Sequence, residues 1–215
     1  MTSQATGRGH AKLILLGEHA VVHGEPALFA GIDRGVRATA SAGGDGRLQV
    51  APWGLEARAG DGSQVGRALA ALLGALGSPA VSFSATADIP AGAGLGSSAA
   101  MAAALARAAA GLTGADEATI RAAVDASEGV FHGNPSGIDA TAALSGGLGL
   151  YRRGHGTTPL AVRQRVKLLV GLSGKARQTA TMVENVGTLA RRLPVARRII
   201  ETLGACTLAG VEALE

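Results

Sequence analysis

Apolar and polar positions follow two periods along this chain, and together they predict an α+β protein. Strict alternation over Val81–Ala85 predicts a half-buried strand, whereas apolar residues at helical spacing predict helices elsewhere. Strands are expected over 12–16, 27–32, 35–42, 47–53, 81–87, 146–151 and 165–172. Helices are expected over 63–76, 98–111, 116–131, 136–144, 175–191 and 195–214. The run Gly43–Gly46 between two strand segments predicts a hairpin turn.

A glycine-rich loop precedes the most alanine-rich helical segment. Gly92, Gly94 and Gly96 let the backbone bend tightly, and Ser97 or Ser98 suits the N-cap of the helix that follows. The free N–H groups at such a helix start favour an anion, most often phosphate. Taken alone, the glycines are explained about as well by a purely structural turn as by a phosphate-binding loop. The loop is not a Walker A motif, because no Gly-Lys-Ser/Thr follows it.

Two other segments contain candidate chemistry. Leu13–Leu16 predicts a buried strand with Lys12 at its start, and Gly17 then places Glu18 and His19 side by side. Taken singly, a lysine such as Lys12 more often marks a solvated strand end, and a histidine such as His19 is more often hydrogen-bonded within a loop.

The second segment begins at Glu128. Its Asn-Pro and Ser-Gly pairs predict a tight turn, and Asp139 is expected in the first turn of the next helix, where the helix dipole stabilises a negative charge. An ordinary acidic residue near a helix start and a surface glutamate are the plainer alternatives.

Three stretches resemble the mevalonate kinases of the GHMP small-molecule kinase superfamily, in the same order along the chain. They are KLILLGEHAVVHG at 12–24, PAGAGLGSSAA at 90–100 and HGNPSGID at 132–139. The resemblance covers about residues 8 to 190. It implies an α+β GHMP kinase fold, with an N-terminal ribosomal-protein-S5-like domain over 1–163 that binds ATP and substrate. An incomplete ferredoxin-like C-terminal domain is expected over 164–215.

The resemblance also implies roles, position by position. Asp139 matches the catalytic base and Lys12 the lysine beside it, while Ser98 and Glu128 match the Mg²⁺ ligands. The residues that match the ATP-binding loop and its neighbour are Pro90, Gly92, Ala93, Gly94, Leu95, Gly96, Ser97, Ser98 and Ser136. The residues that match the mevalonate site are Glu18, His19 and Thr179. The implied reaction moves the γ-phosphoryl group of ATP to the 5-hydroxyl of mevalonate, a step towards isoprenoids.

Composition limits the other classes of function. The net charge of +4 is spread along the chain and aromatic residues make up 2%, so a nucleic-acid platform is not expected. No apolar run approaches the ~20 residues that cross a bilayer. Cys206 is the single cysteine, which excludes a disulfide within the chain and suits a reducing compartment; we expect it to be buried. The expectation is a cytoplasmic protein with ATP and mevalonate as ligands.

The C-terminal part differs from the family pattern. Mevalonate kinases are longer and have a third glycine-rich segment, which the 215 residues lack. We therefore expect an uncovered apolar face, which leaves a homodimer open. Two alternatives also stay open: another GHMP kinase, for phosphomevalonate or homoserine, and a truncated remnant that binds nucleotide without turnover.

Overall fold

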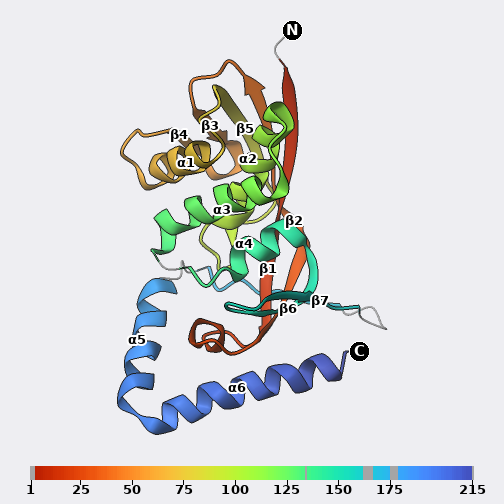
Figure 1. The fold of residues 1–215 in the computed structure, drawn as a ribbon, viewed down its shortest axis with the longest axis vertical. Coiled ribbons are helices and arrows are strands. Elements are labelled where there is room, and N and C mark those ends of the chain that lie inside the picture. Colours follow the sequence, from red (N-terminus) through yellow and green to blue (C-terminus); the bar gives the residue numbers. More distant parts are fainter. Residues whose placement is uncertain (1–2, 134, 162–166, 175–178, 215) are drawn as a thin grey trace.

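A long strand, β2 (Ala27–Ala42), forms the spine of a mixed sheet (Figure 1). β1 (Gln4–Leu16) pairs antiparallel with one edge of it. The other edge is divided, because β5 (Val81–Ala87) pairs with 36–42 and β6 (Gly147–Arg152) pairs with 27–31. The sheet is completed by β3 (Arg47–Val50) beside β5, β4 (Leu55–Arg58) beside β3 and β7 (Gly156–Pro159) beside β6.

Helices cover one face of this sheet. The computed structural model describes residues 3–133, 135–161, 167–174 and 179–214, with backbone only at 179 and 180. α2 and α4 contact β1 and β2, while α1 and α3 pack beside α2. The helices are α1 (Gln64–Ala75), α2 (Ser97–Thr113), α3 (Glu117–His132), α4 (Ile138–Ser145), α5 (Thr179–Arg192) and α6 (Pro194–Glu212). Short 3-10 turns lie at η1 (Ala20–His23) and η2 (Ala51–Trp53).

The contact between β1 and α2 is made by the smallest side chains. The buried side of α2 is almost all alanine. Gly7 and Gly9 face it from β1, where a Cβ atom at either glycine would collide with the helix backbone at Ala104 or Ala100. The backbones of strand and helix therefore touch directly, which fixes the N-terminal end of α2 beside the middle of β1.

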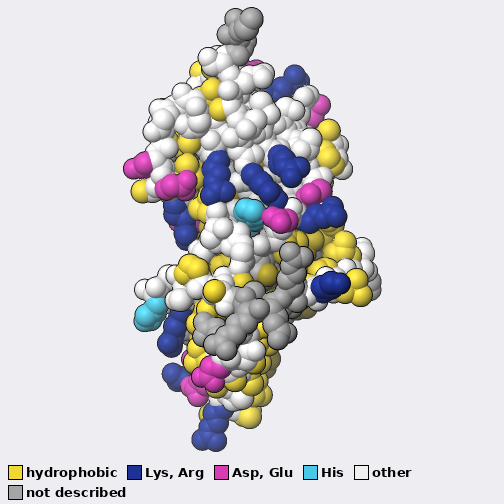
Figure 2. Space-filling model, turned by 90° about the vertical axis from the view of Figure 1, so that its right-hand side faces the viewer, with side chains coloured by type: hydrophobic (Ala, Val, Ile, Leu, Met, Phe, Trp, Pro, Cys, Tyr) yellow, Lys and Arg dark blue, Asp and Glu magenta, His cyan; other side chains and the backbone are white. Residues whose placement is uncertain are grey.

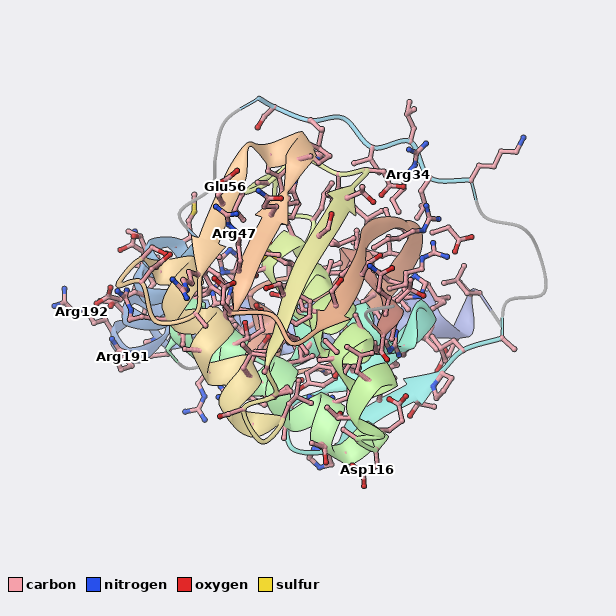
Figure 3. The ribbon with its side chains drawn as sticks, turned by 90° about the horizontal axis from the view of Figure 1, so that it is seen from above. Arg34, Arg47, Glu56, Asp116, Arg191 and Arg192 are labelled. Atoms are coloured by element: carbon pink, nitrogen blue, oxygen red, sulfur yellow. The ribbon has the colours of Figure 1, made fainter. Side chains whose placement is uncertain are left out.

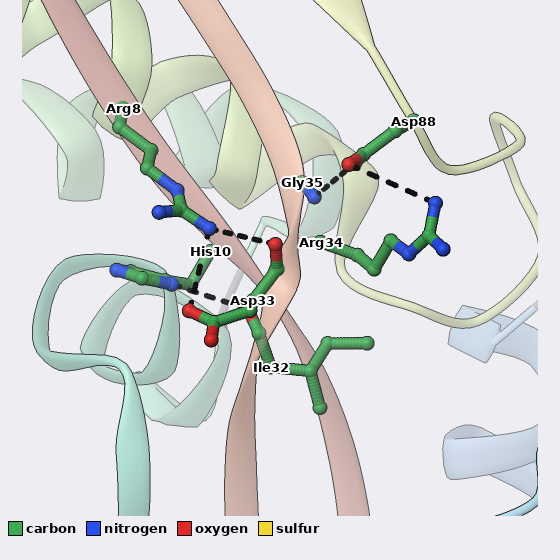
Figure 4. Close-up of polar contacts among 7 residues, drawn as sticks. All are labelled: Arg8, His10, Ile32, Asp33, Arg34, Gly35 and Asp88. Carbon is green, nitrogen blue, oxygen red and sulfur yellow. Dashed lines mark hydrogen bonds and ion pairs between the residues drawn. The ribbon is translucent and has the colours of Figure 1, made fainter.

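The break that the sequence predicts between 27–32 and 35–42 is a β-bulge within one strand. β1 residues 4–10 pair with 35–41 and residues 11–16 with 28–32, so Asp33 and Arg34 lie outside the register. Polar contacts brace this point (Figure 4): the Arg8 guanidinium donates to the Asp33 carbonyl at 2.6 Å, and the Gly35 N–H donates to Asp88 Oδ1 at 2.5 Å. The polar pair marks a bulge rather than a strand end.

The predicted hairpin at Gly43–Gly46 is wrong. β5 lies between β2 and β3, and the turn donates backbone hydrogen bonds to Ala80 and Val81 at the start of β5 instead. Turn residues specify a reversal of the chain, but the identity of the neighbouring strand depends on long-range pairing. The strand expected over 47–53 ends at Val50, because Pro52 lies in a 3-10 turn, and the sequence pattern missed β4 and β7.

Three further expectations need correction or fall outside the description. Lys12 lies well inside β1, not at the start of a strand. Within the described part of the predicted strand 165–172, residues 167–172 form no strand, and its first two residues lie outside the described residues, as does the domain boundary expected at 163 and 164. Cys206 is exposed on α6, not buried, whereas its neighbours Thr207 and Gly204 are buried on that helix.

Charge and apolar surface are distributed unevenly. Figure 2 shows Lys and Arg mixed with Asp and Glu over the upper part of one face, and more hydrophobic side chains in the lower part. Arg191 and Arg192 point away from the body at the end of α5 (Figure 3). Exposed apolar side chains on α5, α6 and the preceding segment include Leu169, Met182, Leu189, Val195 and Ile199. No helix among the described residues is long and apolar enough to span a membrane.

Candidate active site

A cavity of about 610 Å³ opens where β1, the glycine loop and the ends of α2, α3 and α4 meet. η1 and α5 complete its wall. Its lining combines apolar side chains with a cluster of charged groups. The residues are Lys12, Ile14, Glu18, His19, Val21, Val22, Gly92, Gly94, Gly96, Ser97, Ser98, Asp125, Glu128, His132, Pro135, Ser136, Gly137, Ile138, Asp139, Ala140, Met182 and Val183.

An ion pair between the buried Lys12 and the half-buried Asp139 lies in the wall of this cavity. Lys12 Nζ is 2.6 Å from Asp139 Oδ1, and Lys12 is 9% exposed. Gly137, with φ of 89°, ends the preceding turn in the left-handed region and places Asp139 in the first turn of α4, as the sequence predicts. Tyr151 fixes the same turn, because its hydroxyl donates to the Ser136 carbonyl at 2.5 Å.

The glycine loop is anchored to the same strand. The Lys12 N–H donates to the Leu95 carbonyl at 2.9 Å, and Gly92, Gly94 and Gly96 all have φ between 69° and 81°. The N-cap of α2 is Gly96 and not a serine, so no side chain caps the helix start. The Ser97 hydroxyl instead accepts from the Gly92 N–H at 3.3 Å. Among the described residues, no side chain accepts from the first N–H groups of α2, so these groups can bind an anion.

Glu128 is the most constrained acid of the site. It is 1% exposed, and neither carboxylate oxygen has a hydrogen bond of good geometry among the described residues, although the Ser98 hydroxyl lies near enough to lower its pKa. Burial, and then the negative charge of Asp139, raise the pKa of Glu128 to about 7, while the Ser98 hydroxyl and the Lys12 ammonium act in the opposite direction. Its nearest cationic candidate is His132, one helical turn later, with Nε2 at 3.6 Å from Oε2.

These groups fit a divalent cation. Ligand atoms of Glu128, His132 and Asp139 all lie within 4.8 Å of one another. A buried carboxylate with both oxygens unpartnered is costly unless a cation balances it. Carboxylate and hydroxyl oxygens, such as those of Glu128 and Ser98, are the hard ligands that Mg²⁺ prefers.

His19 is held in an uncommon backbone conformation at the rim of η1. Its φ is 65°, and its Nδ1 atom is buried without a partner among the described residues. Non-glycine residues with positive φ are uncommon and concentrate at functional sites. Glu18 precedes it and is exposed at the same wall.

The structure brings most of the predicted site residues together. Eleven line the one cavity: Lys12, Glu18, His19, Gly92, Gly94, Gly96, Ser97, Ser98, Glu128, Ser136 and Asp139. Pro90, Ala93 and Leu95 do not line it; Leu95 is buried in the core and contributes only its carbonyl to the loop anchor. Thr179 begins α5, but its side chain lies outside the described residues.

Sequence reasoning missed three notable contributors. His132 is the last residue of α3, one position beyond the helix predicted to end at 131. Had the helix been extended by one residue, its i, i+4 spacing from Glu128 would have placed both side chains on one face. Met182 and Val183 reach the cavity from α5 through the tertiary arrangement alone, and no local pattern indicates this.

Known proteins of one kinase superfamily are similar to this chain. Residues 63–147 match the family of the GHMP kinases N terminal domain. The chain is 34% identical to a mevalonate kinase of Aeropyrum pernix over 212 residues, which covers 90% of this chain and 64% of that protein. It is 33% identical to a mevalonate kinase of Methanothermobacter thermautotrophicus over 205 residues, with 92% and 66% covered.

A solved structure shows the same fold. The mevalonate kinase of L. major, in complex with R-mevalonate, superimposes with a TM-score of 0.78 at 29% identity, covering 99% of this chain and 70% of that one. The chain thus spans somewhat less than two thirds of the curated relatives and matches them over 82–92% of its own length. It has the GHMP kinase fold, matches the N-terminal domain of the GHMP kinases over residues 63–147, and is similar in sequence and structure to the mevalonate kinases.

Proposed function

We propose that this protein is an ATP-dependent kinase that transfers the γ-phosphoryl group of ATP to the 5-hydroxyl of mevalonate. The observation that supports this most directly is the Lys12–Asp139 pair at 2.6 Å, beside an uncapped helix start in one cavity. Phosphoryl transfer requires a positioned hydroxyl, an acceptor for its proton and positive charge near the transferring group. This cavity contains residues for each of these tasks.

Asp139 is the proposed base. A carboxylate oxygen accepts the proton of the substrate hydroxyl as the oxygen attacks the γ-phosphorus. Lys12 balances the charge of Asp139 and supplies a fixed cation near the transferring phosphoryl group. The Lys12 main chain also holds the glycine loop through Leu95, so one residue connects the strand, the loop and the base.

The glycine loop is the proposed ATP phosphate site. Its residues are Pro90, Gly92, Ala93, Gly94, Leu95, Gly96, Ser97 and Ser98, with Ser136 lining the same cavity. The free N–H groups of the first turn of α2 donate to phosphate oxygens, and the helix dipole adds a positive potential. Glu128 and Ser98 would hold Mg²⁺, which when bound would neutralise phosphate charge.

The part of the cavity wall that contains Glu18 and His19 is the proposed mevalonate site. Glu18 accepts from a substrate hydroxyl, and Nδ1 of His19, which has no partner within the described part of the chain, gains a hydrogen-bond partner. The similarity of L. major mevalonate kinase, whose structure contains R-mevalonate, supports this choice of substrate. Thr179 remains part of the proposal on sequence grounds. We also propose that residues 1–163 form the N-terminal unit and that 164–215 belong to a second one.

The test is ADP release from ATP and Mg²⁺ by this chain, measured in parallel with mevalonate, phosphomevalonate and homoserine. Turnover with mevalonate alone supports the proposal, and turnover with either other substrate replaces it by another GHMP kinase activity. ATP binding is measured separately by calorimetry. Binding without turnover on any of the three would indicate a nucleotide-binding protein and contradict the proposed reaction.

A further inference from the structure

One side-chain hydrogen bond joins α3 to α4 close to the proposed base. The Arg121 guanidinium of α3 donates from Nη1 to the Thr141 hydroxyl of α4 at 3.1 Å. Thr141 follows Asp139 by two residues, and its N–H donates to the Gly137 carbonyl at 3.0 Å, so it lies in the helical turn that presents the base. Within the described part of the chain, no other hydrogen bond or ion pair connects these two helices.

Both ends of this hydrogen bond are held in place. Arg121 Nε donates to Asp125 Oδ2 at 2.8 Å, one turn later on the same helix, and a planar guanidinium with two engaged donors has a defined orientation. The Thr141 side chain is buried, and Arg121 is the one partner of its hydroxyl among the described residues. A buried hydroxyl that loses its partner costs free energy. The contact is therefore a specific link and not a chance meeting of surface groups.

The charges on the two helices explain why a link is useful at this place. Glu128 of α3 and Asp139 of α4 have carboxylate oxygens within 4.8 Å of each other, so the two acids repel when both are ionised. This repulsion pushes the ends of the helices apart. Lys12 holds Asp139 from β1 and forms no hydrogen bond or ion pair with α3 among the described residues. The bond from Arg121 to Thr141 is the contact that opposes the separation of α3 and α4.

We infer that Arg121 is a positioning residue for phosphoryl transfer, because through the Thr141 hydroxyl it holds the first turn of α4, and with it the Asp139 carboxylate, at a fixed place in the cavity. Neither Arg121 nor Thr141 is among the described residues that line the cavity, so both act through Asp139. The inference rests on the proposed function, since it concerns the same base. A displacement of about 1 Å can cost ~10²-fold in rate, so the loss of this link should lower kcat.

The test is a double-mutant cycle on this hydrogen bond. Thr141→Val removes the hydroxyl and keeps the shape of the side chain, Arg121→Met removes the donor, and Thr141→Ser restores the hydroxyl. We expect kcat with mevalonate to fall at least about tenfold in Thr141→Val and in Arg121→Met. The double variant should match the weaker single variant within about twofold, because both changes remove the same bond, and Thr141→Ser should stay within about twofold of the unsubstituted chain.

Two comparisons separate positioning from a general loss of structure. The KM for ATP should change by less than about twofold in every variant, since the link lies away from the glycine loop. Arg197→Met removes another i, i+4 ion pair, on the exposed side of α6, and is the matched control for the loss of the Arg121–Asp125 pair. It should leave kcat unchanged.

A second readout needs no turnover. In the chain labelled with ¹³C at the aspartate carboxyl carbons, the Asp139 signal is assigned by its absence in Asp139→Asn. Without nucleotide and at one pH, this signal should move in Thr141→Val and in Arg121→Met, and it should stay in place in Thr141→Ser and in Arg197→Met. Because the two single variants change different helices, a folding defect in one leaves the other to decide.

Three results would overturn the inference: losses of kcat that add in the double variant, an equal loss in Thr141→Ser and Thr141→Val, or an Asp139 signal that does not move in Thr141→Val. If the unsubstituted chain does not phosphorylate mevalonate, the proposed function fails, and the NMR comparison alone decides whether Arg121 positions the carboxylate. The two failures are therefore distinguishable.

Discussion

The Nζ atom of Lys12, in the middle of β1, lies 2.6 Å from Oδ1 of Asp139 in the first turn of α4. The pair joins two segments that are far apart in the sequence. Lys12 also donates its main-chain N–H to the glycine loop. Lys12 thus links the proposed base to the proposed phosphate site. The residues around it can be tested one at a time.

Asp139→Asn should abolish turnover, with a loss of about 10²–10⁴-fold, because the amide cannot accept the hydroxyl proton. ATP binding should stay within a few-fold, since Asp139 does not belong to the glycine loop. The measurement is steady-state ADP release together with calorimetric ATP binding. Asp33→Asn, at the exposed bulge, is the matched control. Turnover that survives in Asp139→Asn removes it from the role of base.

Glu128 predicts a distinct pH dependence of stability. Its pKa is raised from the ordinary 4.5 to about 7 in the folded protein, so the folded protein binds more protons between these values than the unfolded chain does. The contribution of Glu128 to the free energy of unfolding is fully present below pH 4.5, and it is lost as pH rises through about 7. Without metal, Glu128→Gln should therefore gain stability relative to the unsubstituted chain from about pH 5 to 8, by at most about 3 kcal/mol.

Urea unfolding at about pH 5, 6, 7 and 8 in EDTA measures this difference. Glu117→Gln, at the exposed start of the same helix, is the matched control for the change of side chain. If the difference for Glu128→Gln is constant with pH, Glu128 titrates normally and its carboxylate is not buried without a partner in solution.

Ser98→Ala should raise the Mg²⁺ concentration that gives half-maximal turnover, by roughly tenfold, because one hydroxyl ligand is lost. Ser97→Ala is the matched variant, since the Ser97 hydroxyl accepts from Gly92 within the loop. It should change the KM for ATP and leave the cation requirement unchanged. Equal cation requirements in both variants would exclude Ser98 as a ligand.

Gly96→Ala and Gly92→Ala form another pair. The two glycines have φ of 69° and 70°, so alanine at either should cost about 1–2 kcal/mol of stability. Only at Gly96 would the new Cβ lie 3.0 Å from Lys12 Cγ, while at Gly92 nothing lies within 4 Å. We expect kcat to fall several-fold further in Gly96→Ala, measured under saturating ATP. The same kcat in both variants would contradict the coupling of loop and lysine.

The sequence predicts the bounds of individual helices better than it predicts which strands pair with each other. The helices were found within a few residues because caps and periodicity are local signals, as at Ser63 and Asp116. The hairpin at Gly43–Gly46 failed because β5, far along the chain, inserts between the two strands. In the site, motif residues were identified, whereas Met182 and Val183 depend on how α5 returns to the cavity.

The contact of β1 with α2 has a consequence for how precisely the site is built. At Gly7 and Gly9 the strand presents hydrogen atoms where other residues have a methyl group, so the spacing is set by the van der Waals radii of two main chains. No rotamer can change to absorb a substitution there. The backbone contact therefore sets the distance between Lys12 and the glycine loop at the start of α2. The cost is an interface with no room even for an added methyl group.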